Sequence, residues 1–150
     1  MLITEDWSVK LCDFGLSRYQ SKFDADNHGK IGTPHWMAPE ILRGEKYTSA
    51  ADVYSFGAIL WEMLASDIPF KGRQIPQITG MVGYYRETLK VPPQCNASLR
   101  KIVNNCLVYD PERRPNFEHI VEYLKQVEVE AKKDESVSPI MITKLRDFLY

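Results

Sequence analysis

The sequence has little of what marks secreted, membrane-spanning or metal-binding proteins. Its 150 residues include three cysteines, Cys12, Cys95 and Cys106, which form no Cys-x-x-Cys pair. This pattern argues against a disulfide framework or a zinc site, so we expect buried, free thiols. The densest apolar stretch, GAILWEMLA, is short and contains Glu62, and the first ten residues are not typical of a signal peptide. We therefore expect a cytoplasmic protein with no membrane partner.

An excess of charge of one sign is also missing. The formal net charge is -1, from 19 Lys and Arg against 20 Asp and Glu. Binding to a phosphate backbone needs a surplus of basic residues, so we expect no nucleic-acid partner. The hydrophobic share of 44% is ordinary for a globular chain and predicts one domain or one large piece of a domain.

The apolar pattern predicts a short strand pair followed by helices. Leu2-Ile3 and residues 9–12 flank a polar turn, which is typical of a β-hairpin. Residues 13–39 show little periodicity, and stretches of this kind within a domain are most often functional or mobile. The fold class expected is therefore mainly α, with a short N-terminal β-hairpin followed by a helical bundle.

Three segments carry helical spacing of apolar residues. Residues 49–66 begin with a Ser-x-x-Asp capping box, Ser49 to Asp52, and are apolar nearly all round, which predicts the buried axis of the domain. Residues 98–107 and 116–133 are typical of amphipathic helices. Residues 73–85 contain one proline and two glycines, so we expect at most a short helix there.

Four motifs follow one another along the chain. Asp13-Phe14-Gly15 alone favours an ordinary turn, because an Asp two residues before a Gly is common in turns. It is followed by GTPHWMAPE at residues 32–40, DVYSFG at 52–57 and DPERRP at 110–115. Four motifs in this order and spacing leave little room for chance.

With these motifs the chain resembles the C-terminal, large lobe of the protein kinase family. The residues of the second and third motifs are similar to those of the tyrosine-kinase-like branch of serine/threonine kinases. The resemblance implies a partial kinase domain at residues 1–128, with an activation segment at 13–40 and a C-terminal tail at 129–150. It implies transfer of the γ-phosphate of ATP to Ser or Thr hydroxyls of protein substrates in signal transduction. Thr33 favours that specificity, because tyrosine kinases typically carry a proline there.

The resemblance assigns roles around the phosphate. Asp13 matches the magnesium-binding aspartate, and Mg²⁺ is a hard ion that prefers carboxylate oxygens. Phe14 matches the aromatic residue whose packing sets active and inactive states, and Gly15 matches the glycine where the backbone turns. Thr33 matches a residue that hydrogen-bonds the catalytic aspartate and lysine; otherwise it is a loop threonine before a proline.

Further positions match structural and regulatory residues of the family. Glu40 and Arg114 match a buried ion pair, against the alternative of two surface charges. Asp52 matches the aspartate that anchors the catalytic loop, against the alternative of helix capping, and both roles are compatible. Candidate phosphorylation sites are the hydroxyls of Ser17, Ser21 and Thr33, although any exposed loop contains hydroxyls.

The family's remaining nucleotide motifs find no match in the sequence. The glycine-rich loop, the ATP-contacting lysine with its glutamate, and the His-Arg-Asp catalytic loop are all absent. In the family pattern the strand at Leu2 follows the catalytic asparagine directly, so we expect the N-lobe and catalytic loop to precede this chain. Mg²⁺ and ATP are then cofactors of the complete kinase, and the chain alone binds no ATP tightly and transfers no phosphate.

Two further expectations follow from the missing parts. The uncovered lobe is expected to expose apolar surface and to be only marginally stable. The alternative to a kinase piece is a non-catalytic, kinase-like module that binds partners. An unrelated nucleotide-binding domain is disfavoured, because the sequence has no phosphate-cradling glycine loop.

Overall fold

The computed structural model describes residues 2–5, 8–17 and 33–131. They belong to two compact units, one built from residues 1–17 and 117–150 and the other from residues 18–116. Ser21, much of the predicted activation segment and most of the predicted tail lie outside the described residues. No helix within the described part of the chain is long and apolar enough to cross a membrane.

The N-terminal hairpin belongs to the first unit. Strand β1 (Leu2–Ile3) pairs antiparallel with β2 (Val9–Lys10), and Leu2 lies opposite Lys10. The backbone N–H of Thr4 donates to the carbonyl of Ser8 at 2.9 Å, which closes the turn between the strands. The predicted strand pair is confirmed, although its second strand ends two residues before Cys12.

Helix α5 (Phe117–Ala131) also belongs to the first unit. Its buried side chains are Ile120, Leu124 and Val127, which recur at the spacing of one helical face. The predicted helix at 116–133 is therefore confirmed over the residues that the structure describes.

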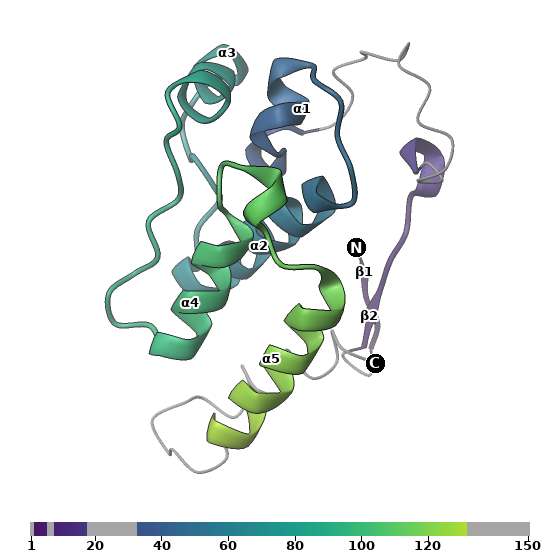
Figure 1. Cartoon of the computed structure of the whole chain (residues 1–150), viewed down its shortest axis with the longest axis vertical. Coiled ribbons are helices and arrows are strands. Elements are labelled where there is room, and N and C mark those ends of the chain that lie inside the picture. The colour runs from purple at the N-terminus through teal and green to yellow at the C-terminus, as the bar shows by residue number, and fades with distance from the viewer. Residues whose placement is uncertain (1, 6–7, 18–32, 132–150) are drawn as a thin grey trace. The chain divides into compact units, whose positions relative to one another are not determined.

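The second unit is organised around α2 (Ala50–Ala65), which packs against α4 (Ala97–Cys106) as Figure 1 shows. The buried residues of α2 are Ala51, Val53, Tyr54, Gly57, Ala58 and Leu60. Its remaining apolar side chains are only partly exposed, so the predicted buried axis is confirmed. The mainly α fold class is confirmed as well.

The predicted capping box at the start of α2 is wrong. The backbone of Ser49 is already helical (φ -56°, ψ -17°), and its side chain makes no capping hydrogen bond. An N-cap side chain reaches the first-turn N–H groups from an extended backbone, which Ser49 does not have. Thr48 instead satisfies a backbone donor at the start of the helix, because its hydroxyl accepts a hydrogen bond from the N–H of Ala50 at 3.2 Å.

The helical segment after residue 73 is longer than predicted. Helix α3 (Ile75–Ile78) continues directly into a π-helical turn (Thr79–Tyr84). Pro76 does not break it, because Pro76 lies in the first turn, where a missing N–H has no helical acceptor. The side chain of Gln77 accepts a hydrogen bond from the Gln74 N–H at 2.8 Å and stabilises the start.

Short helical elements complete the second unit. They are the 3-10 turns η3 (Pro34–Trp36) and η5 (Pro111–Arg113), and the helix α1 (Pro39–Arg43). The aperiodic stretch expected up to residue 39 thus contains η3 and is followed by the unpredicted α1. Helix α1 ends at Gly44, whose φ of 74° lies in the left-handed region that favours glycine.

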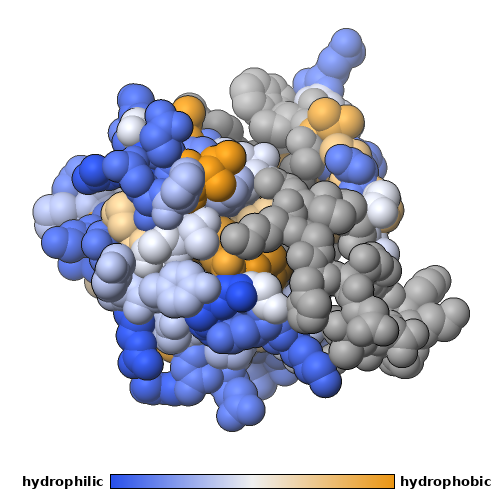
Figure 2. All heavy atoms as spheres, turned by 90° about the horizontal axis from the view of Figure 1, so that it is seen from above, coloured by the Kyte–Doolittle hydropathy of each residue, from blue (hydrophilic) through white to orange (hydrophobic). Residues whose placement is uncertain are grey.

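The surface of the described residues is largely hydrophilic with separate hydrophobic patches, as the view in Figure 2 shows. Among the exposed large side chains, Phe14, Tyr84 and Tyr85 are each more than 60% exposed, which agrees with the expectation of exposed apolar surface. The cysteines are free, but the expectation that all are buried is wrong. Cys106 is buried, Cys95 is half-buried and Cys12 is exposed.

We predict that Gly57→Ala destabilises the fold. A Cβ at Gly57 would lie 2.5 Å from the Cβ of Cys106, which is closer than two Cβ atoms can approach. The packed helices α2 and α4 would have to move apart to make room for it. Overpacking of this kind costs about 1–3 kcal/mol, more than the helix propensity that alanine gains. Urea denaturation should show the loss. The control is Gly80→Ala, whose Cβ would meet its nearest atom at 3.8 Å. Equal stability of the two variants would contradict the prediction.

We also predict graded thiol reactivity. Burial raises the pKa of Cys106 to about 12, so its thiol stays neutral and inaccessible in the folded chain. At pH 8 a disulfide reagent should modify Cys12 quickly and Cys106 only after denaturation. Stability that depends on the neutral Cys106 thiol is present below about pH 9 and is lost as the pH rises toward 12. Fast labelling of Cys106 in Cys12→Ser protein would be inconsistent with this burial.

Candidate functional site

Asp13 lies in an exposed turn. It precedes the 3-10 turn η1 (Phe14–Leu16) and has φ 63° and ψ 65°, a left-handed conformation that aspartate tolerates better than most residues. The N–H of Ser17 donates to the carbonyl of Phe14 at 3.0 Å and closes the turn. A Cβ at Gly15 would lie 3.5 Å from Asp13 Oδ1, which is an ordinary contact. The turn therefore presents the carboxylate and the Phe14 ring to solvent.

The described residues do not form a complete metal site around Asp13. Mg²⁺ needs a near-octahedral set of oxygen ligands, and phosphates supply part of it when a nucleotide is bound. No group of three or more His, Cys, Asp or Glu side chains able to hold a metal ion occurs within the described ranges. Asp13 can supply one carboxylate ligand, but the side chains around it do not fit a whole site for Mg²⁺ and ATP.

Thr33 is also exposed, and it belongs to the second unit. Its backbone is extended (φ -91°, ψ 115°) and leads into η3, where its carbonyl accepts a hydrogen bond from the Trp36 N–H at 3.5 Å. Its hydroxyl has no hydrogen-bond partner among the described residues, so it is available to a group outside them. Of the other two candidate phosphorylation sites, Ser17 is exposed and Ser21 lies outside the described residues.

Glu40 and Arg114 form a fully buried ion pair. Arg114 Nη1 donates to Glu40 Oε1 at 2.7 Å, and Nη2 donates to Oε2 at 2.9 Å. The arginine side chain is 0% exposed and the glutamate side chain 2% exposed. The two planar groups therefore meet in the bidentate geometry that is strongest for this pair of side chains.

Three backbone carbonyls complete the environment of the Arg114 guanidinium. Nε donates to Val108 at 2.8 Å, Nη1 to Ala50 at 2.8 Å and Nη2 to Tyr109 at 3.0 Å. A guanidinium has five N–H donors, so all of them are used. The pair thereby joins α1, the first residue of α2 and the segment that leads to η5.

The ring of Tyr54 covers the pair. The Arg114 Cζ lies 5.1 Å from the ring centroid, within the range of a cation–π contact. Burial, together with the negative charge of Glu40, raises the pKa of Tyr54 well above its usual range, although Arg114 opposes the effect. Tyr54 therefore stays neutral, and its ring excludes water from the guanidinium.

Asp52 lies in the first turn of α2, where its side chain is exposed and makes no hydrogen bond to any described residue. Partial desolvation raises the pKa of this carboxyl. The capping alternative for Asp52 is not seen, because the Ser49 side chain makes no cap hydrogen bond. An anchoring role for Asp52 stays a prediction.

Sequence reasoning missed two polar contacts of this unit. Trp36 Nε1 donates to Glu62 Oε2 at 2.8 Å and links η3 to α2. The ring of Tyr109 is in contact with two guanidinium groups, those of Arg43 and Arg86, each with its Cζ 4.8 Å from the ring centroid. No spacing in the sequence signals either contact, because the partners come from separate segments.

We predict that Glu40→Gln lowers the free energy of unfolding by about 3–5 kcal/mol, because the charge of Arg114 is left buried without compensation. The matched control is Glu45→Gln. Glu45 pairs with Arg43 at 2.5 Å at the surface, and losing an exposed pair costs about 0–1 kcal/mol. Denaturation monitored by circular dichroism would measure both. Similar losses in the two variants would show that burial does not set the cost.

Comparisons with known proteins agree on one family. A family model described as protein tyrosine and serine/threonine kinase matches residues 1–124. A probable serine/threonine-protein kinase, drkC of Dictyostelium discoideum, is 39% identical over 127 residues, which cover 83% of this chain and 17% of the relative. Serine/threonine-protein kinase CTR1 of Arabidopsis thaliana is 37% identical over 125 residues, covering 83% of this chain and 15% of the relative.

A human relative extends the comparison to animals. Mitogen-activated protein kinase kinase kinase 11 of Homo sapiens is 32% identical over 130 residues, which cover 87% of this chain and 15% of the relative. The chain thus spans less than a fifth of the length of each of these three relatives.

Proposed function

The chain belongs to the protein kinase family, and from this premise we propose that it is the activation segment and helical lobe of a serine/threonine protein kinase. The recognition of the family from the four motifs, including its tyrosine-kinase-like branch, is confirmed. Kinases of this family use ATP and Mg²⁺ and act on protein substrates. The reaction proposed for the whole protein is transfer of the ATP γ-phosphate to Ser or Thr hydroxyls, in cytoplasmic signal transduction and without a nucleic-acid or membrane partner.

The buried Glu40–Arg114 pair is the observation that carries this proposal. It links the Ala-Pro-Glu end of the second motif to the Arg-Pro end of the fourth, and every guanidinium donor is satisfied. The link holds the end of the proposed activation segment against the lobe below it, which supports the proposal. We propose residues 1–128 as the partial kinase domain, with the activation segment at 13–40 and a tail at 129–150.

The proposed site residues divide between chemistry and support. Asp13 is proposed as the magnesium ligand, with Phe14 and Gly15 beside the nucleotide, and the exposed turn supports this by leaving the carboxylate accessible. Thr33 is proposed to hydrogen-bond the catalytic aspartate and lysine beside the incoming hydroxyl, supported by its exposed side chain, which has no hydrogen-bond partner among the described residues. Ser17, Ser21 and Thr33 are still proposed as candidate phosphorylation sites.

Asp52 is proposed to anchor the catalytic loop. A partly desolvated carboxylate with a raised pKa and no described partner is costly, and backbone N–H donors from another segment would compensate it. Glu40 and Arg114 are proposed as structural residues that hold the end of the activation segment.

We propose that the 150 residues alone are inactive. The phosphate cradle, its lysine and the catalytic base have no counterpart in the sequence, and phosphoryl transfer depends on positioning and charge stabilisation by these groups. The alternative is a non-catalytic, kinase-like binding module that docks partners through the activation segment and the helical lobe.

Titration of the chain with Mg²⁺ and ATP tests the inactivity. Calorimetry should detect no affinity in the micromolar range, because a single carboxylate offers no phosphate cradle. A micromolar dissociation constant would overturn this part of the proposal.

A chimera tests the activity. The kinase-domain sequence of the drkC relative that precedes its matched region, joined to this chain, should restore phosphorylation of Ser or Thr in a general protein substrate. Asp13→Asn in the chimera should reduce the rate at least about a hundredfold, since a metal ligand contributes several kcal/mol to charge stabilisation. The matched control is Asp67→Asn, which removes only an exposed pair with Lys71. A folded but inactive chimera would favour the binding module.

A further inference from the structure

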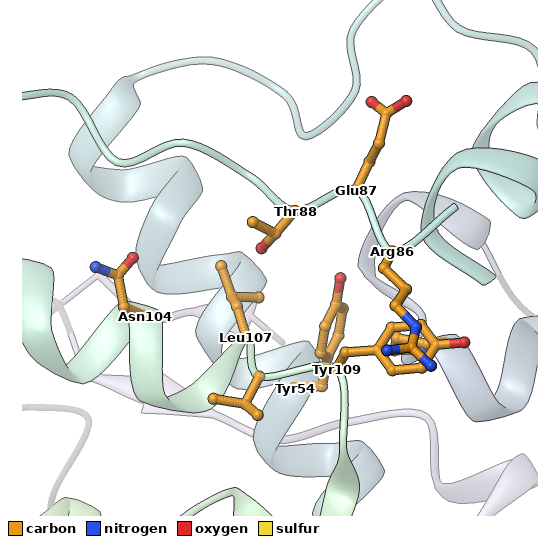
Figure 3. A pocket seen from close by; sticks show the side chains of 9 residues that line it. Tyr54, Arg86, Glu87, Thr88, Asn104, Leu107 and Tyr109 are labelled. Atoms are coloured by element: carbon orange, nitrogen blue, oxygen red, sulfur yellow. The ribbon is translucent and has the colours of Figure 1, made fainter. Parts of the chain in front are cut away.

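Two adjoining hollows of the second unit share the residues Arg86, Val108 and Tyr109, and we call them together the Tyr109 groove. The first has a volume of about 270 Å³ and the second of about 530 Å³. Figure 3 shows the first hollow, with Thr88 and Leu107 on one side and Arg86 on the other. The second is lined by Arg43, Arg86, Val108, Tyr109, Asp110, Pro111 and Arg113. The groove is concave, and its walls are partly apolar and partly cationic, as in binding sites.

The ring of Tyr109 is fixed in place. Its hydroxyl donates to the Gly83 carbonyl at 2.8 Å and accepts a hydrogen bond from Arg43 Nη1 at 2.5 Å, and the Cζ atoms of Arg43 and Arg86 each lie 4.8 Å from the ring centroid. Arg43 is held in place, because it also donates to Glu45 twice and to the carbonyl of Gly83. A rigid aromatic ring in such a frame loses little entropy when a ligand packs beside it.

The N–H donors of Arg86 and Arg113 are unused, although the Arg86 guanidinium contacts the Tyr109 ring. Both side chains are exposed, and within residues 33–131 neither guanidinium has an ion pair or a hydrogen bond. The backbone of Arg86 has φ 58°, a conformation that is rare for a residue other than glycine. Two cations with their donors unused therefore line one groove.

Two carboxylates also belong to the groove. Glu87 lines the first hollow and Asp110 the second, and neither forms an ion pair with another described residue. The carboxylate of Asp110 accepts a hydrogen bond from the Glu112 N–H at 3.1 Å and keeps its charge. Three arginines, Arg43, Arg86 and Arg113, against these two carboxylates leave the lining net positive.

Tyr54 adds a polar group to the first hollow. The residue is 2% exposed, and its hydroxyl points toward the space beside Thr88 and Leu107 in Figure 3. This hydroxyl has no hydrogen-bond partner among the described residues, but its oxygen is not itself buried and meets solvent in the hollow. A hydroxyl exposed in a hollow is free to pair with a polar group of a ligand.

We propose that the Tyr109 groove docks an extended acidic segment of a protein partner. Arg86 and Arg113 bind its carboxylates through charge-assisted hydrogen bonds, the apolar walls contact its side chains, and the Tyr54 hydroxyl pairs with one polar group. Charge complementarity selects an acidic over a neutral peptide. The site involves neither Asp13 nor Thr33 and needs no nucleotide, so it goes beyond the proposed phosphoryl transfer and does not depend on it.

Fluorescence anisotropy without nucleotide tests the proposal on the 150-residue chain. The probe is a labelled peptide Gly-Glu-Glu-Tyr-Glu-Glu-Gly, compared with the same peptide carrying Gln for Glu. Arg86→Gln and Arg113→Gln should each weaken binding of the acidic peptide at least about fivefold. Arg73→Gln, which removes an exposed arginine outside the groove, should change the affinity less than twofold. Circular dichroism melts establish that each variant is folded.

A second variant isolates the Tyr54 hydroxyl. Tyr54→Phe removes only an oxygen without a described protein partner, so the fold should be kept while peptide affinity falls about two- to fivefold. Equal binding of the Glu and Gln peptides, or equal losses in the Arg73 and Arg86 variants, would overturn the docking site. Displacement of the peptide by inorganic phosphate, beyond that by sodium chloride at the same ionic strength, would also overturn it by indicating a small-anion site.

Discussion

The buried pair of Glu40 and Arg114 is the interaction on which the second unit depends. Two charges removed from water incur a large desolvation cost, which only good geometry and complete hydrogen bonding offset. Here the carboxylate is held bidentately and three backbone carbonyls use the remaining guanidinium donors. Glu40 belongs to α1, Ala50 is the first residue of α2, and Val108 and Tyr109 precede η5, so this one arginine side chain sets where the three segments meet. The pair therefore specifies an arrangement more than it adds stability.

The same side chain connects the core to the surface groove. Arg114 donates a hydrogen bond to the Tyr109 carbonyl, while the Tyr109 ring contacts Arg43 and Arg86. Tyr54 covers the guanidinium with its ring and reaches the first hollow with its hydroxyl. Tyr54 and Tyr109 thus contact Arg114 of the buried pair and also line the groove. A substitution that disturbs the pair is therefore expected to alter the groove as well.

The proposed functional residues divide into buried structural residues and exposed catalytic residues. The proposed structural residues Glu40 and Arg114 are buried, whereas the proposed catalytic residues Asp13 and Thr33 are exposed and belong to different units. The family assignment and the mainly α fold are confirmed, while the roles of individual site residues stay predictions.

The sequence by itself determined the helices at 50–65 and 97–106 and the order of the kinase motifs, because apolar periodicity and motif spacing are local properties. It predicted the ion pair only through the family resemblance, since its members lie 74 residues apart. The tertiary structure alone decided that Thr48 rather than Ser49 serves the start of α2, because the backbone angles set which oxygen reaches the N–H. It alone placed Arg43, Arg86 and Tyr109 together, because contacts between distant segments form only when the core has packed.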